Sequence, residues 1–225
     1  MPERKRSLRE RRKQQRAYRA RARRPRWGAV IAVMILIAGG LFAFSAVRNG
    51  GDAAGVSSVS AANSEGPPDA PVTVIEFGDF ACPSCRAWHN SGIKDRLRAE
   101  FGEQIRFTFR HLPVITAQSP KAAEAAQCAA DQDAFWQYHD YLYEQVAPDQ
   151  LAPAQLKQYA AALGLDSQAF DSCLDSGRYK AYVQQDMQTA LDMGARGTPS
   201  FFVNGQPANL FSYESAVAAL RQHLP

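Results

Sequence analysis

The sequence contains few of the side chains that bind metal ions. Of its 225 residues, four are cysteine and four are histidine. Two cysteines form a C-x-x-C at Cys82 and Cys85, but the sequence has no second C-x-x-C and no H-x-x-x-H. A structural zinc site needs four ligands, and His89 is the one histidine near the pair in sequence. We therefore expect no metal ion, and we expect the histidines to be surface or structural residues: His89, His111, His139 and His223.

Acidic residues are scarce at the N-terminus. Residues 1–26 hold 13 Lys and Arg but only two Glu, a local charge of +11. The whole chain carries +4, so residues 27–225 carry −7. A basic tail of this kind is compatible with nucleic-acid binding. The uncharged segment that follows favours a different role, because clustered basic residues beside a membrane span stay in the cytoplasm.

Charge is absent from residues 28–47, an apolar run of 20 residues. A helix of that length, at about 1.5 Å per residue, spans roughly the 30 Å of a bilayer's hydrocarbon core. With Trp27 at its edge, the segment predicts a single transmembrane helix over residues 27–47 in the cell membrane. Residues 1–26 are then a cytoplasmic tail, and the rest of the chain is extracytoplasmic. A cleaved signal peptide is the alternative, although its apolar region is normally about 7–15 residues long.

Hydrophobic periodicity is absent from residues 48–70, which are rich in Gly, Ser, Ala and Asn and end near Pro67-Pro68. This composition predicts a flexible linker. Residues 71–225 then form one domain, long enough to bury a good core.

Within that domain, the pattern of apolar residues, caps and turns predicts strands and helices in a defined order. The expected strands are 72–77, 105–110, 200–203 and 207–210, with a tight turn at Asn204-Gly205. The expected helices are 83–100, 119–130, 134–145, 153–163, 167–175, 178–193 and 212–223. This order predicts an α/β fold in which a helical subdomain, about residues 118–193, is inserted into the sheet-forming chain.

Cys82 and Cys85 follow an apolar strand and open a helix. Pro83 suits the first turn of a helix, so Cys82 lies at the helix N-terminus, where free N–H groups and the dipole favour an anion. The thiolate is the nucleophile of disulfide chemistry, and this position lowers a thiol pKa. The pair is therefore interpreted as a redox pair. Half of a zinc site and two inert buried thiols are the alternatives.

A second motif, Gly197-Thr198-Pro199, directly precedes the apolar strand 200–203. Proline is the residue that admits a cis peptide bond. Alone, the motif is best explained as an ordinary proline at the start of a strand. Together with a C-x-x-C that follows a strand, it favours a functional interpretation.

The two motifs with their flanks, Phe77-Gly78-Asp79-Phe80-Ala81-Cys82-Pro83-Ser84-Cys85 and residues 197–205, resemble the DsbA-like branch of the thioredoxin superfamily. The resemblance covers residues 71–225 and implies a thioredoxin fold with an inserted helical subdomain. It also implies that Cys82 attacks, that Cys85 resolves the mixed disulfide, and that Pro199 is cis. Thr198 is then the neighbour that contacts substrate.

Glu76, six residues before Cys82, is similar to the family's buried acidic residue that assists proton transfer. A carboxylate in an apolar strand has a raised pKa, which suits proton exchange near neutral pH. The alternative is a strand residue that faces solvent. The sequence departs from the best-known oxidase pattern at Ser84, where a histidine would stabilise the thiolate, and this leaves the direction of the redox reaction open.

Cys128 and Cys173 lie on separate predicted helices, 45 residues apart. Outside the cytoplasm an even number of cysteines indicates pairing. We expect a structural disulfide that stabilises the helical subdomain by about 4 kcal/mol in the chain-entropy model. A second redox relay is the alternative.

These features predict a membrane-anchored, extracytoplasmic thiol–disulfide oxidoreductase that needs no cofactor and oxidises client proteins through a Cys82–Cys85 disulfide. The resemblance implies a quinone-linked membrane partner that reoxidises the enzyme, and no nucleic acid is expected as a partner. A reductase or isomerase with the same residues is one alternative. A non-catalytic binding or chaperone module on a thioredoxin scaffold is another.

Overall fold

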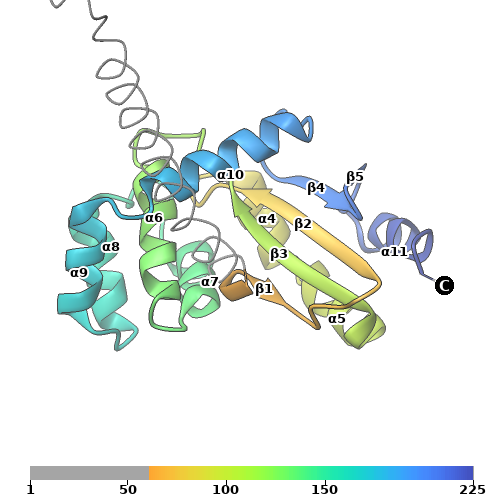
Figure 1. Cartoon of the computed structure of the whole chain (residues 1–225), viewed down its shortest axis with the longest axis horizontal. Helices are drawn as coiled ribbons and strands as arrows, with labels where there is room; N and C mark the ends of the chain where they lie inside the picture. The colour runs from red at the N-terminus through yellow and green to blue at the C-terminus, as the bar shows by residue number, and fades with distance from the viewer. Residues whose placement is uncertain (1–60, 225) are drawn as a thin grey trace, which may run out of the picture. The chain divides into compact units, whose positions relative to one another are not determined.

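The computed structural model of the chain describes residues 61–224 (Figure 1). The predicted cytoplasmic tail, the predicted transmembrane helix and residues 48–60 of the predicted linker lie outside the described residues. Among residues 61–224, no helix combines the length and the apolar character that crossing a membrane requires.

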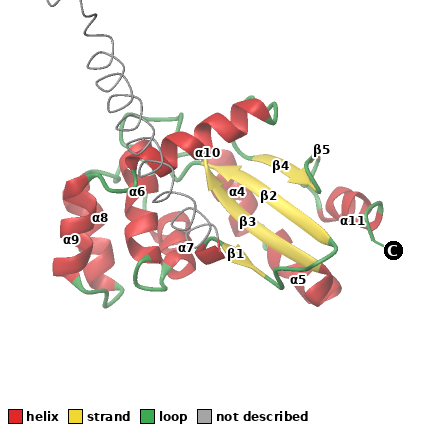
Figure 2. Ribbon diagram, viewed as in Figure 1, coloured by secondary structure: helices red, strands yellow, loops and turns green. Residues whose placement is uncertain are grey.

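A mixed five-stranded sheet forms the centre of the described part (Figure 2). Its spatial order is β1-β3-β2-β4-β5; β2 and β3 are parallel, and the other neighbours are antiparallel. The strands are β1 (Ser64–Glu65), β2 (Val72–Gly78), β3 (Ile105–His111), β4 (Ser200–Val203) and β5 (Gln206–Ala208). Because β2 is the central strand, the loop that leaves its C-terminal end lies against neighbours on both sides.

The side chains of β2 alternate between two hydrophobic clusters. Val72 and Val74 pack in one cluster with residues of α5 (Ile93–Phe101) and α11 (Tyr213–Arg221). Phe77 packs in another cluster, with Ala190 from α10 (Lys180–Asp192). Both faces of the strand are therefore covered, which explains why it is almost continuously apolar.

The predicted helical subdomain is present. After β3 the chain forms α6 (Ser119–Ala130), α7 (Phe135–Gln145), α8 (Pro153–Ala162) and α9 (Ser167–Ser176), and α10 leads back to β4. In Figure 1, α8 and α9 lie at the end of this part farthest from α11, and α6 and α7 lie between them and the sheet. One large hydrophobic cluster joins these helices to Phe80, Cys82 and Cys85.

The single helix predicted over residues 83–100 is wrong in one respect, because the chain forms two helices there. They are α4 (Pro83–Asn90) and α5, and they are followed by a short 3-10 helix, η1 (Gly102–Gln104). Gly92 has φ 66°, a left-handed conformation that glycine adopts readily and that interrupts an α-helix. The Ser91 hydroxyl donates to Trp88 O at 2.6 Å, which satisfies a carbonyl at the end of α4.

Strand β1 was not predicted and lies within the range assigned to the linker. It pairs antiparallel with β3, with Ser64 opposite Thr108 and Glu65 opposite Phe107. Two polar residues carry no hydrophobic alternation, so the sequence contains no strand signal there. Before β1, Asn63 is fully buried, and its carbonyl accepts a hydrogen bond from Phe109 N at 3.0 Å. The folded part therefore begins before residue 71.

Candidate active site

The loop between β2 and α4 is held by the carboxylate of Asp79, which is 1% exposed. Its Oδ1 accepts a hydrogen bond from Ala81 N at 2.8 Å. Its Oδ2 accepts from Val114 N and Ile115 N, both at 2.8 Å. One buried side chain therefore ties the loop before Cys82 to the loop after β3. The sequence interpretation missed this residue, although an aspartate directly after a strand is a typical former of side-chain-to-backbone turns.

Cys82 is the N-cap residue of α4, as the sequence predicted. Its Sγ accepts a hydrogen bond from Cys85 N at 3.4 Å, and Pro83 occupies the first turn. Cys82 N donates to Asp79 O at 2.9 Å. The sulfur of Cys82 thus takes the place that a serine or aspartate oxygen has at an ordinary helix N-terminus.

The Gly-Thr-Pro motif lies against this thiol. The Thr198–Pro199 peptide bond is cis, and Cys82 Sγ donates to Thr198 O at 3.1 Å, across 116 residues of sequence. The register of the sheet explains the contact. Ser200, the first residue of β4, pairs with Phe77 near the end of β2, so the residues before β4 lie beside the loop that follows β2.

The two active-site thiols have opposite pKa shifts. Hydrogen bonding from the Cys85 thiol, with further contributions from Thr198 and backbone N–H groups, lowers the pKa of Cys82 to about 5 against the opposing effect of burial. Burial raises the pKa of Cys85 far above its usual value of 9.0. The Thr198 hydroxyl is buried and has no other hydrogen-bond partner among the described residues. The Cys82 thiolate is therefore stable near neutral pH, whereas Cys85 stays a thiol.

Glu76 lies in β2 at the centre of the sheet and does not face solvent. It is 6% exposed and is paired with Phe109 on β3 and Phe201 on β4. Burial raises its pKa to about 8; the positive charge of Lys94 opposes this shift, and a thiolate at Cys82 adds to it. Its side chain is thus an acid that interacts electrostatically with Cys82 and has a pKa close to neutral pH.

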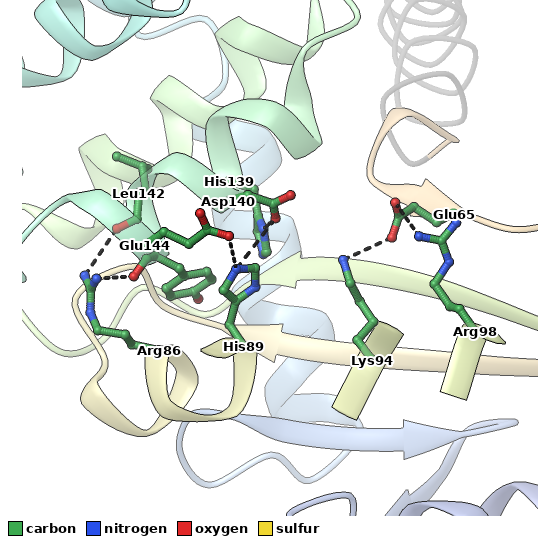
Figure 3. A network of polar contacts seen from close by, with 10 residues as sticks. Glu65, Arg86, His89, Lys94, Arg98, His139, Asp140, Leu142 and Glu144 are labelled. Carbon is green, nitrogen blue, oxygen red and sulfur yellow. Dashed lines mark hydrogen bonds and ion pairs between the residues drawn. The ribbon is translucent and has the colours of Figure 1, made fainter. Parts of the chain in front are cut away.

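Two basic residues that the sequence interpretation missed hold the helices around the site. Arg86, directly after Cys85, donates to Leu142 O at 3.2 Å (Figure 3). It also donates to the carbonyls of Tyr143 and Val146, at the C-terminal end of α7. The last carbonyls of a helix lack internal partners and attract cations, so Arg86 joins α4 to the helical subdomain. Lys94 Nζ lies 3.0 Å from Glu65 Oε2 and 4.1 Å from the centre of the Trp136 ring.

The four cysteines divide as the sequence predicted. Cys128 on α6 and Cys173 on α9 form a disulfide, 45 residues apart. Cys82 and Cys85 are free thiols, and both are buried. The structure therefore describes the reduced form of the C-x-x-C pair.

Comparison with known proteins agrees with this geometry. A family model described as Thioredoxin matches residues 61–222. A probable disulfide bond formation protein D from Bacillus anthracis is 31% identical over 194 residues, which cover 81% of this chain and 88% of that protein. The crystal structure of oxidised BdbD from Bacillus subtilis is 27% identical, with a TM-score of 0.65 and coverage of 72% of this chain and 91% of that one.

A different kind of relative matches over a shorter stretch. A Na(+)/H(+) antiporter NhaA from Herminiimonas arsenicoxydans is 40% identical over 141 residues, which cover 63% of this chain. They cover only 22% of the antiporter, so the chain spans less than a quarter of the length of this relative. The family model and the relative from Bacillus anthracis cover most of the described residues. The chain therefore belongs to the thioredoxin family, and over most of its described residues it is similar to a disulfide bond formation protein D and to BdbD.

Proposed function

We propose that the chain catalyses thiol–disulfide exchange with client proteins, with Cys82 as the attacking and leaving sulfur and Cys85 as the resolving thiol. The observation that carries this proposal is the Cys82 thiol at the N-terminus of α4, in contact with Thr198 O and lowered in pKa to about 5. A thiolate at neutral pH is the reactive species in exchange.

In the oxidising direction a client thiolate attacks Cys82 in the Cys82–Cys85 disulfide. A client–Cys82 bond forms, the Cys82–Cys85 bond breaks, and Cys85 leaves with the electron pair. Cys85 strongly favours its protonated state, so it must take up a proton as it leaves. Glu76, with a pKa raised to about 8 by burial, is the acid that we propose supplies this proton.

A second client thiolate then attacks the client sulfur of the mixed disulfide. The client disulfide forms, and Cys82 leaves as a thiolate. The client has lost two electrons and the C-x-x-C pair has gained them. A low pKa makes Cys82 a good leaving group and stabilises the reduced enzyme, and both effects favour the oxidising direction. The name of the relative from Bacillus anthracis, a probable disulfide bond formation protein, agrees with this direction.

We propose that Thr198 and Pro199 contact the client chain next to its reacting cysteine. Thr198 O is held at 3.1 Å from Cys82 Sγ, so a client sulfur bonded to Cys82 arrives beside this backbone. Thr198 O can accept a hydrogen bond from the client's main chain. Pro199 has no N–H, so it donates no backbone hydrogen bond to the client.

We also propose that residues 27–47 anchor the protein in the cell membrane, with residues 1–26 in the cytoplasm and the C-x-x-C on the outer side. The support is the charge-free run of 20 residues after 13 basic ones. Continued turnover needs an electron acceptor for the reduced pair, and a quinone-linked membrane protein fits an enzyme held at the bilayer. Protease treatment of sealed, right-side-out vesicles tests this topology: residues 61–225 should be digested and residues 1–26 protected, and the reverse pattern would contradict the anchor's orientation.

The direction of the reaction is tested by the reduction potential of the Cys82–Cys85 pair in the full chain, equilibrated with glutathione. A value towards about −120 mV supports disulfide donation, whereas a value near about −270 mV would make the protein a reductase. Oxidation of a reduced two-thiol peptide should be lost in Cys82→Ser. Unchanged oxidation by that variant would refute the role of Cys82, whereas a wild type that binds client proteins but oxidises no peptide would favour the non-catalytic binding module.

A further inference from the structure

Three potential metal ligands that are scattered in the sequence come together beside α4. His89 lies in the last turn of α4, and His139 and Asp140 lie on α7 (Figure 3). One ligand atom from each of the three residues lies within 4.8 Å of the other two. His89 Nε2 is 4.0 Å from Asp140 Oδ1, and His139 Nδ1 is 2.8 Å from the same oxygen.

We propose that His89, His139 and Asp140 form a binding site for one divalent transition-metal ion of the zinc type. The chemistry of the donors supports this class of ion, since imidazole nitrogen with one carboxylate oxygen suits Zn²⁺ and its neighbours in the first transition row. A hard cation such as Ca²⁺ takes six or more oxygen ligands, which these three residues do not offer.

The spacing of the donors fits such an ion after small movements. Zinc binds nitrogen and oxygen at about 2.0–2.2 Å, so tetrahedral ligand atoms are about 3.3–3.6 Å apart. The two distances to Asp140 Oδ1, 2.8 and 4.0 Å, lie on either side of that range. The side chain of Asp140 is 42% exposed, which leaves it room to make the adjustment.

A fourth ligand is within reach. Glu144 Oε1 is 3.4 Å from His89 Nε2, and the side chain of Glu144 is 51% exposed. Residues 140 and 144 are one turn apart on α7, so both carboxylates extend from the same side of the helix. Either Glu144 or a water molecule completes a four-coordinate ion.

The burial of His139 separates this cluster from an ordinary surface ion pair. The side chain of His139 is only 3% exposed, and Nδ1 is the ring nitrogen that faces Asp140. Its ring is packed among aromatic rings, with centroids at 4.7 Å from Phe109 and 5.0 Å from Trp136. Packing therefore holds one ligand in place, which lowers the entropic cost of assembling the site.

The positive charge of Lys94 acts on this cluster and is only partly offset, because Glu65 pairs with both Lys94 and Arg98. Lys94 influences both His139 and Asp140 electrostatically, but its ammonium group is paired with Glu65 at 3.0 Å. A bound ion would link the last turn of α4, the helix that carries the C-x-x-C, to α7 of the helical subdomain. It would act in addition to the hydrogen bonds of Arg86 to the end of α7.

Metal titration of the full chain tests the proposal. The chain is prepared in detergent without a histidine tag and with the Cys82–Cys85 disulfide formed, so that no thiol can bind metal. Calorimetry with Zn²⁺ should show one ion per chain, and Co²⁺ should give the visible absorption of a four-coordinate complex. His89→Asn and Asp140→Asn should each weaken the affinity at least about tenfold, since changes even behind a ligand shell have effects of that size.

His223→Asn, which removes a histidine far along the sequence, is the matched control and should bind the ion as the wild type does. Circular dichroism checks that each variant is folded. The absence of saturable Zn²⁺ binding to the oxidised wild type would overturn the proposal. Equal affinity of His89→Asn and wild type, or an equal loss in His223→Asn, would do the same. Metal affinity and Co²⁺ absorption do not depend on thiol exchange, so they test the metal site independently of the proposed function.

Discussion

Replacing Glu76 by glutamine should stabilise the reduced protein at neutral pH. Glutamine has nearly the shape of a protonated glutamic acid but never becomes charged. In the folded state burial raises the pKa of Glu76 to about 8, from an ordinary value of 4.5. The folded state therefore retains a proton that the unfolded state releases as the pH rises.

The sign and size of the effect follow from this difference. Between pH 4.5 and about 8 the folded state binds more protons at Glu76 than the unfolded state, so this residue makes the free energy of unfolding fall as the pH rises. At 1.36 kcal/mol per pKa unit, the loss at pH 7 is about 3 kcal/mol, and above pH 8 it approaches 5 kcal/mol. Glu76→Gln removes this loss. It should therefore unfold with similar free energy to the wild type near pH 4.5 and be more stable at pH 7 and above.

Urea unfolding of reduced residues 61–225, followed by circular dichroism at pH 4.5, 7 and 8.5, measures the effect. Comparison of variant and wild type at each pH cancels the titration of the buried histidines. Glu214→Gln, an exposed glutamate on α11, is the control and should show no gain at any pH. The oxidised pair should show a smaller gain, because the Cys82 thiolate contributes to the raised pKa. A gain that does not grow with pH, or a loss of stability at every pH, would refute the argument from burial.

Three further predictions concern the thiols and their support. The ultraviolet absorbance of the thiolate should titrate with a midpoint of about 5 in the reduced protein and should disappear in Cys82→Ser. In Thr198→Val the midpoint should be higher, and an unchanged midpoint would show that Thr198 does not lower the pKa of Cys82. Arg86→Gln should lower the free energy of unfolding, measured by urea titration, by about 1.5–3 kcal/mol, because charged hydrogen bonds to three carbonyls are lost. A change below about 0.5 kcal/mol would show that these bonds do not stabilise the packing of α4 against α7. Replacing Cys128 and Cys173 together by alanine should cost about 4 kcal/mol in the chain-entropy model, while the reduction potential of the C-x-x-C pair should stay unchanged if the second pair is purely structural.

The local elements of the fold were predictable because their signals lie within a few residues. The proline after Cys82, the alternation in β3 and the glycines at 164 and 194 each determine backbone conformation nearby, and the structure confirms the helices and strands that they indicate. The break at Gly92 and the strand at Ser64–Glu65 were not predictable in the same way. The first depends on a glycine inside a helix-compatible stretch, and the second exists only because the edge of β3 is available for pairing.

The supporting residues of the site were missed for a related reason. Arg86 and Lys94 belong to no motif, and Asp79 entered only as a residue flanking the C-x-x-C. A charged residue in an isolated sequence is most simply explained as a solvated one. Their roles depend on partners 29 to 60 residues away in the sequence, such as Glu65, the loop at Val114 and the end of α7. Such partners become visible only when the chain has folded.

The sequence by itself determined the chemistry that is available: a C-x-x-C at a helix start, a Gly-Thr-Pro before a strand, and two further cysteines that pair. The apolar run at residues 28–47 stays a prediction of an anchor, since it lies outside the described residues. Only the tertiary structure decided how these groups act on one another. The antiparallel register of β2 and β4 brings Thr198 to Cys82, and burial in the central strand makes Glu76 an acid near neutral pH. The packing of α4 against α7 brings His89 close to His139 and Asp140. Each of these interactions depends on the fold, because electrostatic and hydrogen-bond strength is set by distance in space and not by separation in sequence.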